Sequence, residues 1–221
     1  MLNVKGLDAF IEKTPILRQV SLDLAKGQMA GLVGRNGAGK TTLLRSIMGL
    51  LKPAAGSIAI HDVDVTNLPG FRRARMQVGY MPEDRRLVPE LTVEENVMVP
   101  AWATGIEDAG KRLARIYELM PEVGNFRDRR ALQLSGGQQK LVAFARALMC
   151  GKQLLLLDEP FEGVAPALSH RLVEVLVALK AEGLSVLLSE SDYTHSAALV
   201  DRLFVIERGV VEERPVSRAA A

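Results

Sequence analysis

Residues 34–41 constrain the fold of this chain more than any other part of its sequence. They read Gly-Arg-Asn-Gly-Ala-Gly-Lys-Thr, which is a glycine, four further residues, and then Gly-Lys-Thr. Glycines let the backbone curl so that several N–H groups point at one anion, and a helix beginning near Lys40 would aim its positive end at the same place. The pattern therefore predicts a phosphate-binding loop between a buried strand, residues 29–33, and a helix that stops at Gly49. A chance glycine-rich turn is the alternative.

Each residue of this loop has an expected role toward a bound nucleoside triphosphate. Lys40 would reach the β- and γ-phosphates as a point charge, and Thr41 would offer its hydroxyl oxygen to Mg²⁺. ATP and Mg²⁺ are therefore the expected cofactors. The residues expected to bind the nucleotide here are Gly34, Arg35, Asn36, Gly37, Ala38, Gly39, Lys40, Thr41 and Thr42.

The composition excludes several classes of protein. Lys and Arg number 28 against 26 Asp and Glu, and this net charge of +2 predicts neither a nucleic-acid partner nor an acidic-membrane partner. The one cysteine, Cys150, provides no disulfide framework and favours a reducing compartment. No stretch resembles a signal peptide, and no apolar run is long enough to span a bilayer, so we expect a partner to supply any membrane-spanning part.

Strand and helix patterns predict one α/β domain over residues 1–221. Strands alternate with helices in residues 1–83 and 151–221, which predicts a nucleotide-binding core with a mainly parallel sheet and a small N-terminal antiparallel sheet. Residues 84–150 form an expected helical insertion. Strands are expected at 2–7, 20–24, 29–33, 57–61, 78–81, 154–157, 184–188 and 203–206. Helices are expected at 40–48, from Thr92 onward, at 107–120 (ended by Pro121), at 167–182, and briefly between the last two strands.

A second motif is an acidic pair that follows four leucines. Asp158 and Glu159 would lie at the carboxyl end of a buried strand, which is where open α/β sheets bind ligands. Asp158 would hold Mg²⁺, directly or through water, and Glu159 would orient and polarise the water that attacks the γ-phosphate. The alternative is a solvated acidic turn after a core strand.

The third motif is Leu-Ser-Gly-Gly-Gln at residues 134–138. Ser135 can cap a helix, and Gln138 can complete a capping box. Gly136 and Gly137 in a first turn weaken a helix, which makes sense if another molecule must approach that backbone. A glycine-rich helix start without a ligand is the alternative for this motif on its own.

Together these motifs resemble the ABC-type ATPases over essentially the whole chain. The resemblance implies that two subunits, as a homodimer or with a related chain, pair head to tail with two nucleotides between them. Ser135, Gly136, Gly137 and Gln138 would then face the nucleotide of the partner. It also implies transmembrane permease subunits, an indirect link to a solute-binding protein, no nucleic acid, and a peripheral position on the cytoplasmic face of the cell membrane.

A closer resemblance is to the branched-chain amino-acid importer subgroup. It is carried by residues 80–86 (Tyr-Met-Pro-Glu-Asp-Arg-Arg), 91–96 (Leu-Thr-Val-Glu-Glu-Asn) and 162–166 (Glu-Gly-Val-Ala-Pro). Glu83 occupies the position where most of the wider family has glutamine, in a loop that senses Mg²⁺ and the membrane subunit. We expect Glu83 to serve the metal or the attacking water; a surface acid beside two arginines is the alternative.

Two positions depart from the family pattern. The aromatic residue that usually stacks on adenine is replaced by Ile11, with Phe10 beside it. The switch position, usually His and often Gln in the importer subgroup, falls on Ser191. We expect Ser191 to assist hydrolysis and His195, four residues further on, to take no part.

The expected function is therefore ATP hydrolysis that powers an ABC importer, for branched-chain or related amino acids or similar small polar solutes. An exporter subunit remains an alternative, because the sequence of an ATP-binding subunit does not indicate the direction of transport. A soluble ABC-type ATPase of DNA repair or translation is the alternative class. It is disfavoured because no long coiled coil separates Lys40 from Ser135 and because the chain carries a single set of motifs.

Overall fold

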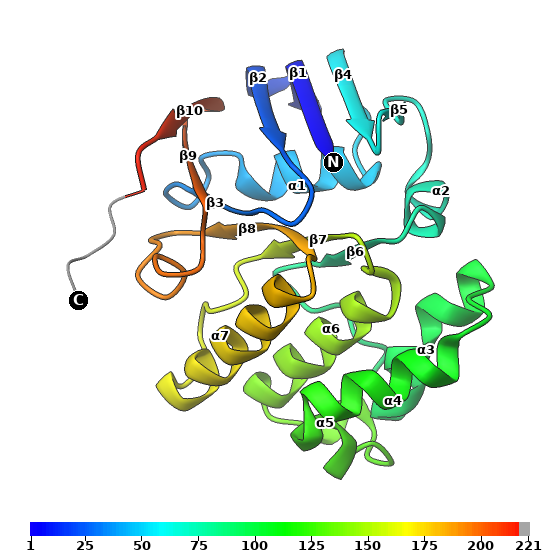
Figure 1. Cartoon of the computed structure of the whole chain (residues 1–221). Coiled ribbons are helices and arrows are strands. Elements are labelled where there is room, and N and C mark those ends of the chain that lie inside the picture. Colours follow the sequence, from blue (N-terminus) through cyan, green and yellow to red (C-terminus); the bar gives the residue numbers. More distant parts are fainter. Residues whose placement is uncertain (217–221) are drawn as a thin grey trace.

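A six-stranded sheet forms the centre of the computed structural model, which describes residues 1–216 (Figure 1). The strand order is β10-β9-β3-β8-β7-β6; β10 alone runs antiparallel to its neighbour, and the other five strands are parallel. The carboxyl ends of the parallel strands therefore share one edge. Their bounds are Met29–Val33 (β3), Val78–Met81 (β6), Leu154–Asp158 (β7), Ser185–Glu190 (β8), Arg202–Glu207 (β9) and Val210–Arg214 (β10).

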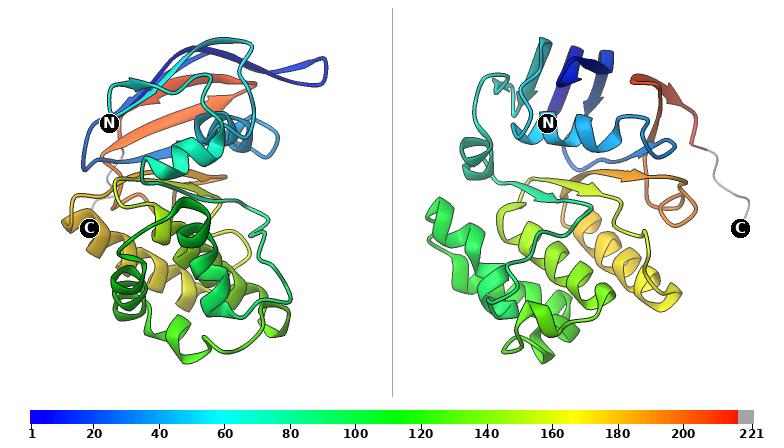
Figure 2. Two further views of the ribbon diagram at one scale, coloured as in Figure 1. Left: turned by 90° about the vertical axis from the view of Figure 1, so that its right-hand side faces the viewer. Right: turned by 180° about the vertical axis from the view of Figure 1, so that it is seen from behind.

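Both faces of this sheet are covered, which explains why β7 is a continuous run of leucines. Leu154 and Leu156 pack toward helix α1 (Lys40–Met48), whereas Leu155 and Leu157 pack toward helices α6 (Gly136–Cys150) and α7 (Pro166–Ala181). Successive side chains of a strand point to opposite faces, so a strand buried on both faces must be apolar throughout. Figure 2 shows α6 and α7 together below the sheet.

A second, four-stranded antiparallel sheet lies beyond α1. Its order is β2-β1-β4-β5, with bounds Leu2–Ile11 (β1), Thr14–Leu24 (β2), Ala55–Ile60 (β4) and Val63–Asp64 (β5). Buried residues of β1, β2 and β4 share one core with Leu43, Leu44 and Ile47 of α1. The helix that follows the phosphate-binding loop is therefore held between two sheets.

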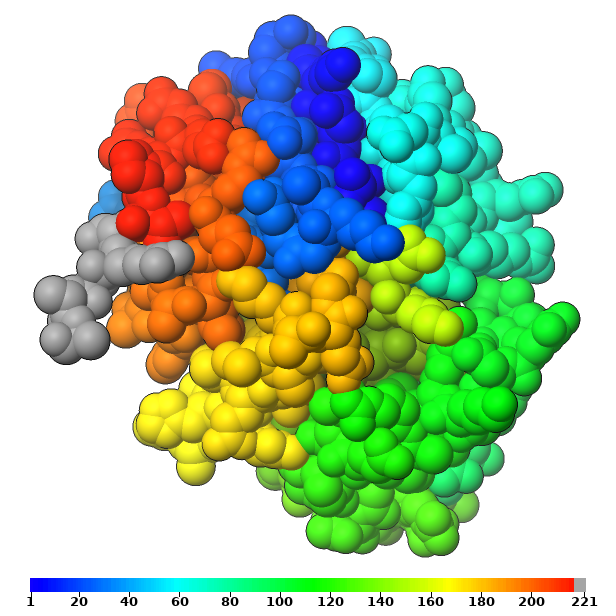
Figure 3. All heavy atoms as spheres, in the orientation of Figure 1, coloured from blue at the N-terminus to red at the C-terminus, as the bar shows by residue number. Residues whose placement is uncertain are grey.

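Residues 84–150 form the inserted helical part of the chain. Its helices are α3 (Val93–Thr104), α4 (Ala109–Leu119), α5 (Pro121–Asn125), the 3₁₀ helix η1 (Ala131–Gln133) and α6, and α3, α4 and α5 pack on α6. Thr92 forms the expected capping box with Glu95 at the start of α3. In the space-filling view these helices lie at the end of the molecule opposite the antiparallel sheet (Figure 3). The predicted α/β class, with a mainly parallel sheet, an antiparallel N-terminal sheet and inserted helices, is confirmed.

The far end of α1 is fixed by a buried arginine that the sequence analysis did not single out. Arg73, on α2 (Gly70–Arg75), donates hydrogen bonds to the carbonyl oxygens of Ser46 at 2.9 Å and Ile47 at 2.7 Å. These carbonyls belong to the last turn of α1, where backbone acceptors lack helical partners. A Cβ at Gly49 would lie 2.6 Å from Arg73 Nε, so the glycine that ends α1 also makes room for the guanidinium.

The predicted short helix between β8 and β9 is wrong. Residues 194–199 form successive turns, because short polar side chains there bond locally rather than leaving the backbone to a regular helix. Asp192 accepts from the backbone N–H and the hydroxyl of Thr194, and Ser196 donates to Glu190. The prediction that Pro121 ends a helix needs refinement, since α4 stops at Leu119 and Pro121 begins α5.

Strand lengths also differ from the predictions at the N-terminus. β1 extends to Ile11, beyond the strand predicted at 2–7. β2 begins at Thr14, before the strand predicted at 20–24. Pairing between the two strands, which no local pattern reveals, accounts for the extra length. Within residues 1–216, no helix combines the length and apolar character that crossing a bilayer requires.

Candidate active site

The loop between β3 and α1 adopts a conformation that only its glycines allow. Gly37 and Gly39 have φ of 82° and 114°, in the left-handed region that L side chains rarely adopt. A Cβ at Gly34 would lie 2.3 Å from the carbonyl oxygen of Ile206 on β9. Among the described residues no side chain caps the N-terminus of α1, so its first N–H groups are free to bind an anion.

A cavity of about 350 Å³ opens beside this loop. It gathers residues from β1, β2, the loop and α1, and residues that follow β6 and β7. Ile11 lines it, whereas Phe10, the neighbouring candidate, does not. The lining residues are Ile11, Ile16, Asn36, Gly37, Gly39, Lys40, Thr41, Thr42, Glu83 and Glu159.

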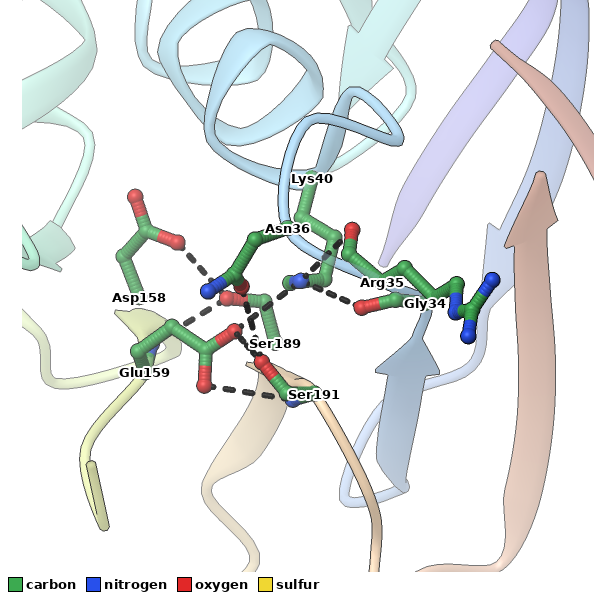
Figure 4. A network of polar contacts seen from close by, with 8 residues as sticks. All are labelled: Gly34, Arg35, Asn36, Lys40, Asp158, Glu159, Ser189 and Ser191. Atoms are coloured by element: carbon green, nitrogen blue, oxygen red, sulfur yellow. Dashed lines mark hydrogen bonds and ion pairs between the residues drawn. The ribbon is translucent and has the colours of Figure 1, made fainter. Parts of the chain in front are cut away.

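Lys40 and Glu159 form a buried ion pair at the floor of this cavity. Lys40 Nζ lies 3.0 Å from Glu159 Oε1, and the two side chains are only 5% and 7% exposed (Figure 4). Lys40 also donates to the carbonyl oxygens of Gly34 and Arg35. The donors of the ammonium group are therefore engaged by two loop carbonyls and by Glu159, and an incoming phosphate must take over some of these contacts.

Ser191 holds the Glu159 carboxylate at both oxygens. Its backbone N–H donates to Glu159 Oε2 at 3.2 Å, and its Oγ lies 3.0 Å from Oε1 (Figure 4). The same Oγ lies 2.9 Å from Asn36 Oδ1 in the phosphate-binding loop. A hydroxyl has one proton to donate, so it serves one of these acceptors at a time. His195 lies outside this network and stacks on Phe161, with ring centroids 5.3 Å apart.

Asp158 lies behind Glu159 and is held by hydroxyl groups. Ser189 Oγ donates to Asp158 Oδ1 at 2.6 Å, and the Tyr80 hydroxyl lies 3.4 Å from Oδ2. Burial raises the pKa of Asp158, while hydrogen bonds from Ser189 and Thr41 act in the opposite direction. Burial, followed by the charge of Asp158, also raises the pKa of Tyr80.

The oxygen atoms around Asp158 fit a magnesium ion. Thr41, Glu83 and Asp158 line one continuous groove, and hydroxyl and carboxylate oxygens are the ligands that Mg²⁺ prefers. Burial and the carboxylates of Asp158, Glu162 and Glu159 raise the pKa of Glu83, so a cation here would relieve repulsion. Within residues 1–216 no group of three or more His, Cys, Asp or Glu could hold a metal. Phosphate and water oxygens would therefore complete the shell.

The Ser135 motif lies elsewhere in the chain. Ser135 Oγ accepts from the N–H of Gln138 at 3.3 Å, and Gln138 Oε1 accepts from the N–H of Ser135 at 3.0 Å, which is the predicted capping box. Ser135 and Gly136 are exposed, and none of residues 135–138 lines the cavity at the phosphate-binding loop. The two motifs therefore do not line one cavity within residues 1–216.

The sequence pattern of the ABC transporter family matches residues 17–162. The chain belongs to this family. It is an ATP-binding subunit of an ABC transporter and an ATP-hydrolysing enzyme, as predicted. Subunits of this family work as dimers with membrane permease subunits, peripheral to the cytoplasmic face of the membrane.

Individual relatives support the family assignment of this ABC subunit. It is 36% identical over 209 residues to the high-affinity branched-chain amino acid transport ATP-binding protein BraG of Pseudomonas aeruginosa, covering 95% of this chain and 90% of BraG. It is 34% identical over 210 residues to the lipopolysaccharide export system ATP-binding protein LptB of Escherichia coli, covering 94% and 87%. The dimeric bacterial ABC transporter cassette MJ0796 superposes with a TM-score of 0.87 at 25% identity, covering both chains completely. The predicted resemblance to the branched-chain subgroup is confirmed.

Sequence reasoning missed two polar residues of this ABC subunit at the end of β8. Ser189, which contacts Asp158, lies opposite it in the parallel register of β7 and β8, so correct strand pairing could have found it. Glu190 is buried, its Oε1 has no hydrogen-bond partner among residues 1–216, and its carbonyl oxygen accepts from the N–H of Gly34 at 3.1 Å. Burial raises the pKa of Glu190 to about 8, and no local pattern marks it as buried.

Proposed function

We propose that this chain hydrolyses ATP to power an importer of branched-chain or related amino acids, or of similar small polar solutes. The observation that carries hydrolysis is the buried contact of Lys40, Glu159 and Ser191 at the phosphate-binding loop. Amino-acid import is supported by the similarity to BraG and by residues 80–86. The similarity to LptB, almost as high, favours an exporter as the second candidate.

In the proposed reaction, the loop N–H groups and Lys40 bind the β- and γ-phosphates. Thr41, Asp158 and Glu83 would hold Mg²⁺, whose positive charge would offset the negative charge of the phosphates. Glu159 orients the attacking water and accepts its proton. Ser191 keeps the Glu159 carboxylate in one orientation, so that its proton-accepting oxygen stays aimed at the phosphate.

Transfer of Lys40 from Glu159 to the γ-phosphate is a step that follows from the observed ion pair. While Lys40 lies 3.0 Å from Glu159 Oε1, the ion pair occupies an oxygen that would otherwise face the attacking water. When phosphate oxygens attract Lys40, Glu159 Oε1 is released from this contact. The arrival of the substrate would thus free the general base.

The proposed assembly has two cassettes, identical or related, that pair head to tail and attach to permease subunits at the cytoplasmic face. Residues 135–138 of each would close over the nucleotide held by the other; Ile11 would support its adenine ring. A groove of about 560 Å³ runs from Glu83 and Asp158 to Leu50, Val99 and Pro100. A permease segment in this groove would contact the metal side of the site directly.

The test is to purify the tagged chain from its own membranes, identify its partners, and reconstitute the complex in vesicles. We expect permease subunits and ATP-dependent uptake of radiolabelled leucine that stops in Glu159→Gln. Extraction of a lipid from the vesicles without leucine uptake would favour the exporter. Recovery with ribosomes or DNA, and no permease, would contradict transport altogether.

A further inference from the structure

The first turn of α6 is held by the side chain of Arg85, which belongs to the loop that carries Glu83. Arg85 Nη1 lies 3.2 Å from the carbonyl oxygen of Gly136 and 3.4 Å from Gln139 Oε1. A Cβ at position 136 would lie 3.2 Å from the same nitrogen. The glycine therefore keeps this approach open, and Arg85 reaches the Ser135 motif through charge-assisted hydrogen bonds.

A second arginine, on α6, contacts the backbone of the Glu83 loop. Arg146, two turns further along α6, donates to the carbonyl oxygens of Arg85 and of Arg86, the latter at 2.6 Å. Arg85 and Arg86 have φ of 63° and 48°, a backbone conformation that needs support at non-glycine residues. The loop thus holds the start of α6, and α6 holds the loop.

The neighbouring arginine makes no such contact. The side chain of Arg86 is 67% exposed and, within residues 1–216, bonds only to Asp84 of the same loop. The two adjacent arginines therefore offer a matched pair, of which one reaches α6 with its side chain and the other does not.

We propose that Arg85 is a positioning residue that sets residues 135–137 relative to Glu83 of its own chain, and thereby acts on the nucleotide bound by the second subunit. This inference rests on the proposed head-to-tail pair. Glu83 reports on the metal of its own site, whereas residues 135–137 face the site of the partner. Arg85 lies in the loop that carries Glu83, and its side chain contacts Gly136. The position of the Ser135 motif in each subunit therefore depends on the Glu83 loop of the same subunit.

The experiment measures dimer formation and nucleotide binding separately. The background is the full chain with Glu159→Gln, which should accumulate as a dimer with MgATP. Into it we introduce Arg85→Gln or, as the matched control, Arg86→Gln. Analytical ultracentrifugation gives the dimer dissociation constant with MgATP, and titration calorimetry gives the affinity of the monomer for MgADP.

We expect Arg85→Gln to weaken the dimer by about tenfold or more, as the loss of a hydrogen bond from a charged group implies. The affinity for MgADP should stay within about twofold, because the phosphate-binding loop is untouched. Arg86→Gln should change neither. An unchanged dimer constant in Arg85→Gln, or a parallel loss of MgADP affinity, would overturn the inference, the latter by showing that Arg85 serves its own site.

Amide hydrogen exchange on the monomer tests the link without the partner. Arg85→Gln should speed exchange in the first turn of α6, and Arg86→Gln should not; unchanged rates would overturn the inference. If the Glu159→Gln parent itself forms no dimer with MgATP, head-to-tail pairing in the proposed function fails instead, which this exchange measurement keeps distinct from a failure of the Arg85 link.

Discussion

The phosphate-binding loop and the Ser135 motif are both built around glycines at the start of a helix, yet the fold treats them differently. Lys40 and Glu159 are buried and paired within one chain. Ser135 and Gly136 are exposed, and within residues 1–216 the side chains that contact them belong to α6 and to Arg85 of the Glu83 loop. The residues around Lys40 meet within one chain, whereas in the proposed assembly the Ser135 motif faces a second chain.

In the proposed assembly, a glycine-rich helix start therefore serves binding within a chain at one position and between chains at the other. The loop at residues 34–39 lies at the carboxyl edge of the parallel sheet, where the ends of β7 and β8 bring carboxylates and hydroxyls to it. None of residues 135–138, at the start of α6, lines the cavity at that loop; the contacts there are the capping box of Ser135 and Gln138 and the hydrogen bond from Arg85.

The largest expected effect on turnover comes from substituting Lys40, in the buried ion pair at the phosphate-binding loop. Lys40→Ala should lower the turnover of ATP by about 10²–10³-fold, because a charge aimed at the developing phosphate charge is lost. It should also weaken nucleotide binding, and Glu159 would be left without its ion-pair partner. Steady-state hydrolysis and equilibrium binding check both effects. Lys26→Ala, at an exposed turn, is the control; near-normal turnover in Lys40→Ala would contradict the assignment of the loop.

A substitution in the exposed Ser135 motif should lower turnover without changing nucleotide affinity. Ser135→Arg should lower turnover by about 10²-fold, since it blocks the approach of the second subunit, while MgADP affinity stays within about twofold of the parent. Lys40→Ala should lose both. Measuring the two quantities for both variants sharpens the contrast between the regions, and full activity of Ser135→Arg is incompatible with a site shared between chains.

A smaller effect is expected at Ser191. Ser191→Ala removes the hydroxyl contact to Glu159 but keeps the backbone N–H contact, so turnover should fall by about three- to tenfold, in line with one hydrogen bond. His195→Ala, the matched variant four residues away, should hydrolyse ATP at the parent rate. The kcat values of the two variants decide this. If His195→Ala is strongly impaired while Ser191→Ala is not, the assignment of the switch position is wrong.

The smallest effect on turnover, but a distinct effect on stability, is expected at Glu190. Its pKa in the folded protein is raised to about 8 from an ordinary 4.5. Between pH 4.5 and pH 8 the folded chain keeps a proton on Glu190 that the unfolded chain has lost. The free energy of unfolding therefore falls as pH rises through this range, by at most about 1.4 kcal/mol per pH unit. Above pH 8 the loss is complete.

Glu190→Gln stays neutral and should escape this loss. Urea unfolding of parent and variant at pH 5 and pH 8.5 should show the variant gaining stability relative to the parent as pH rises. Glu207→Gln, at an exposed position, is the control. The same relative stability at both pH values would contradict a neutral, buried Glu190.

Some features of this protein follow from the sequence alone because their causes are local. The loop at residues 34–39 needs glycines for its own backbone angles, and the box at Ser135 and Gln138 closes within one helical turn. The strand that ends in Asp158 is marked by its unbroken run of leucines. Spacing and residue type were sufficient for each of these predictions.

Other features were decided only when distant segments met. Parallel pairing of β7 with β8 sets Ser189 against Asp158, and the turn that begins at Ser191 brings a hydroxyl to Glu159. The link from Arg85 to Gly136 crosses 51 positions of sequence. The sequence marks Glu190 as an ordinary polar residue, yet the fold buries it and, in the part of the chain that the structure describes, leaves its Oε1 without a hydrogen-bond partner. Burial and contact between strands depend on which neighbours the whole chain supplies, and no window of the sequence contains both sides of such a contact.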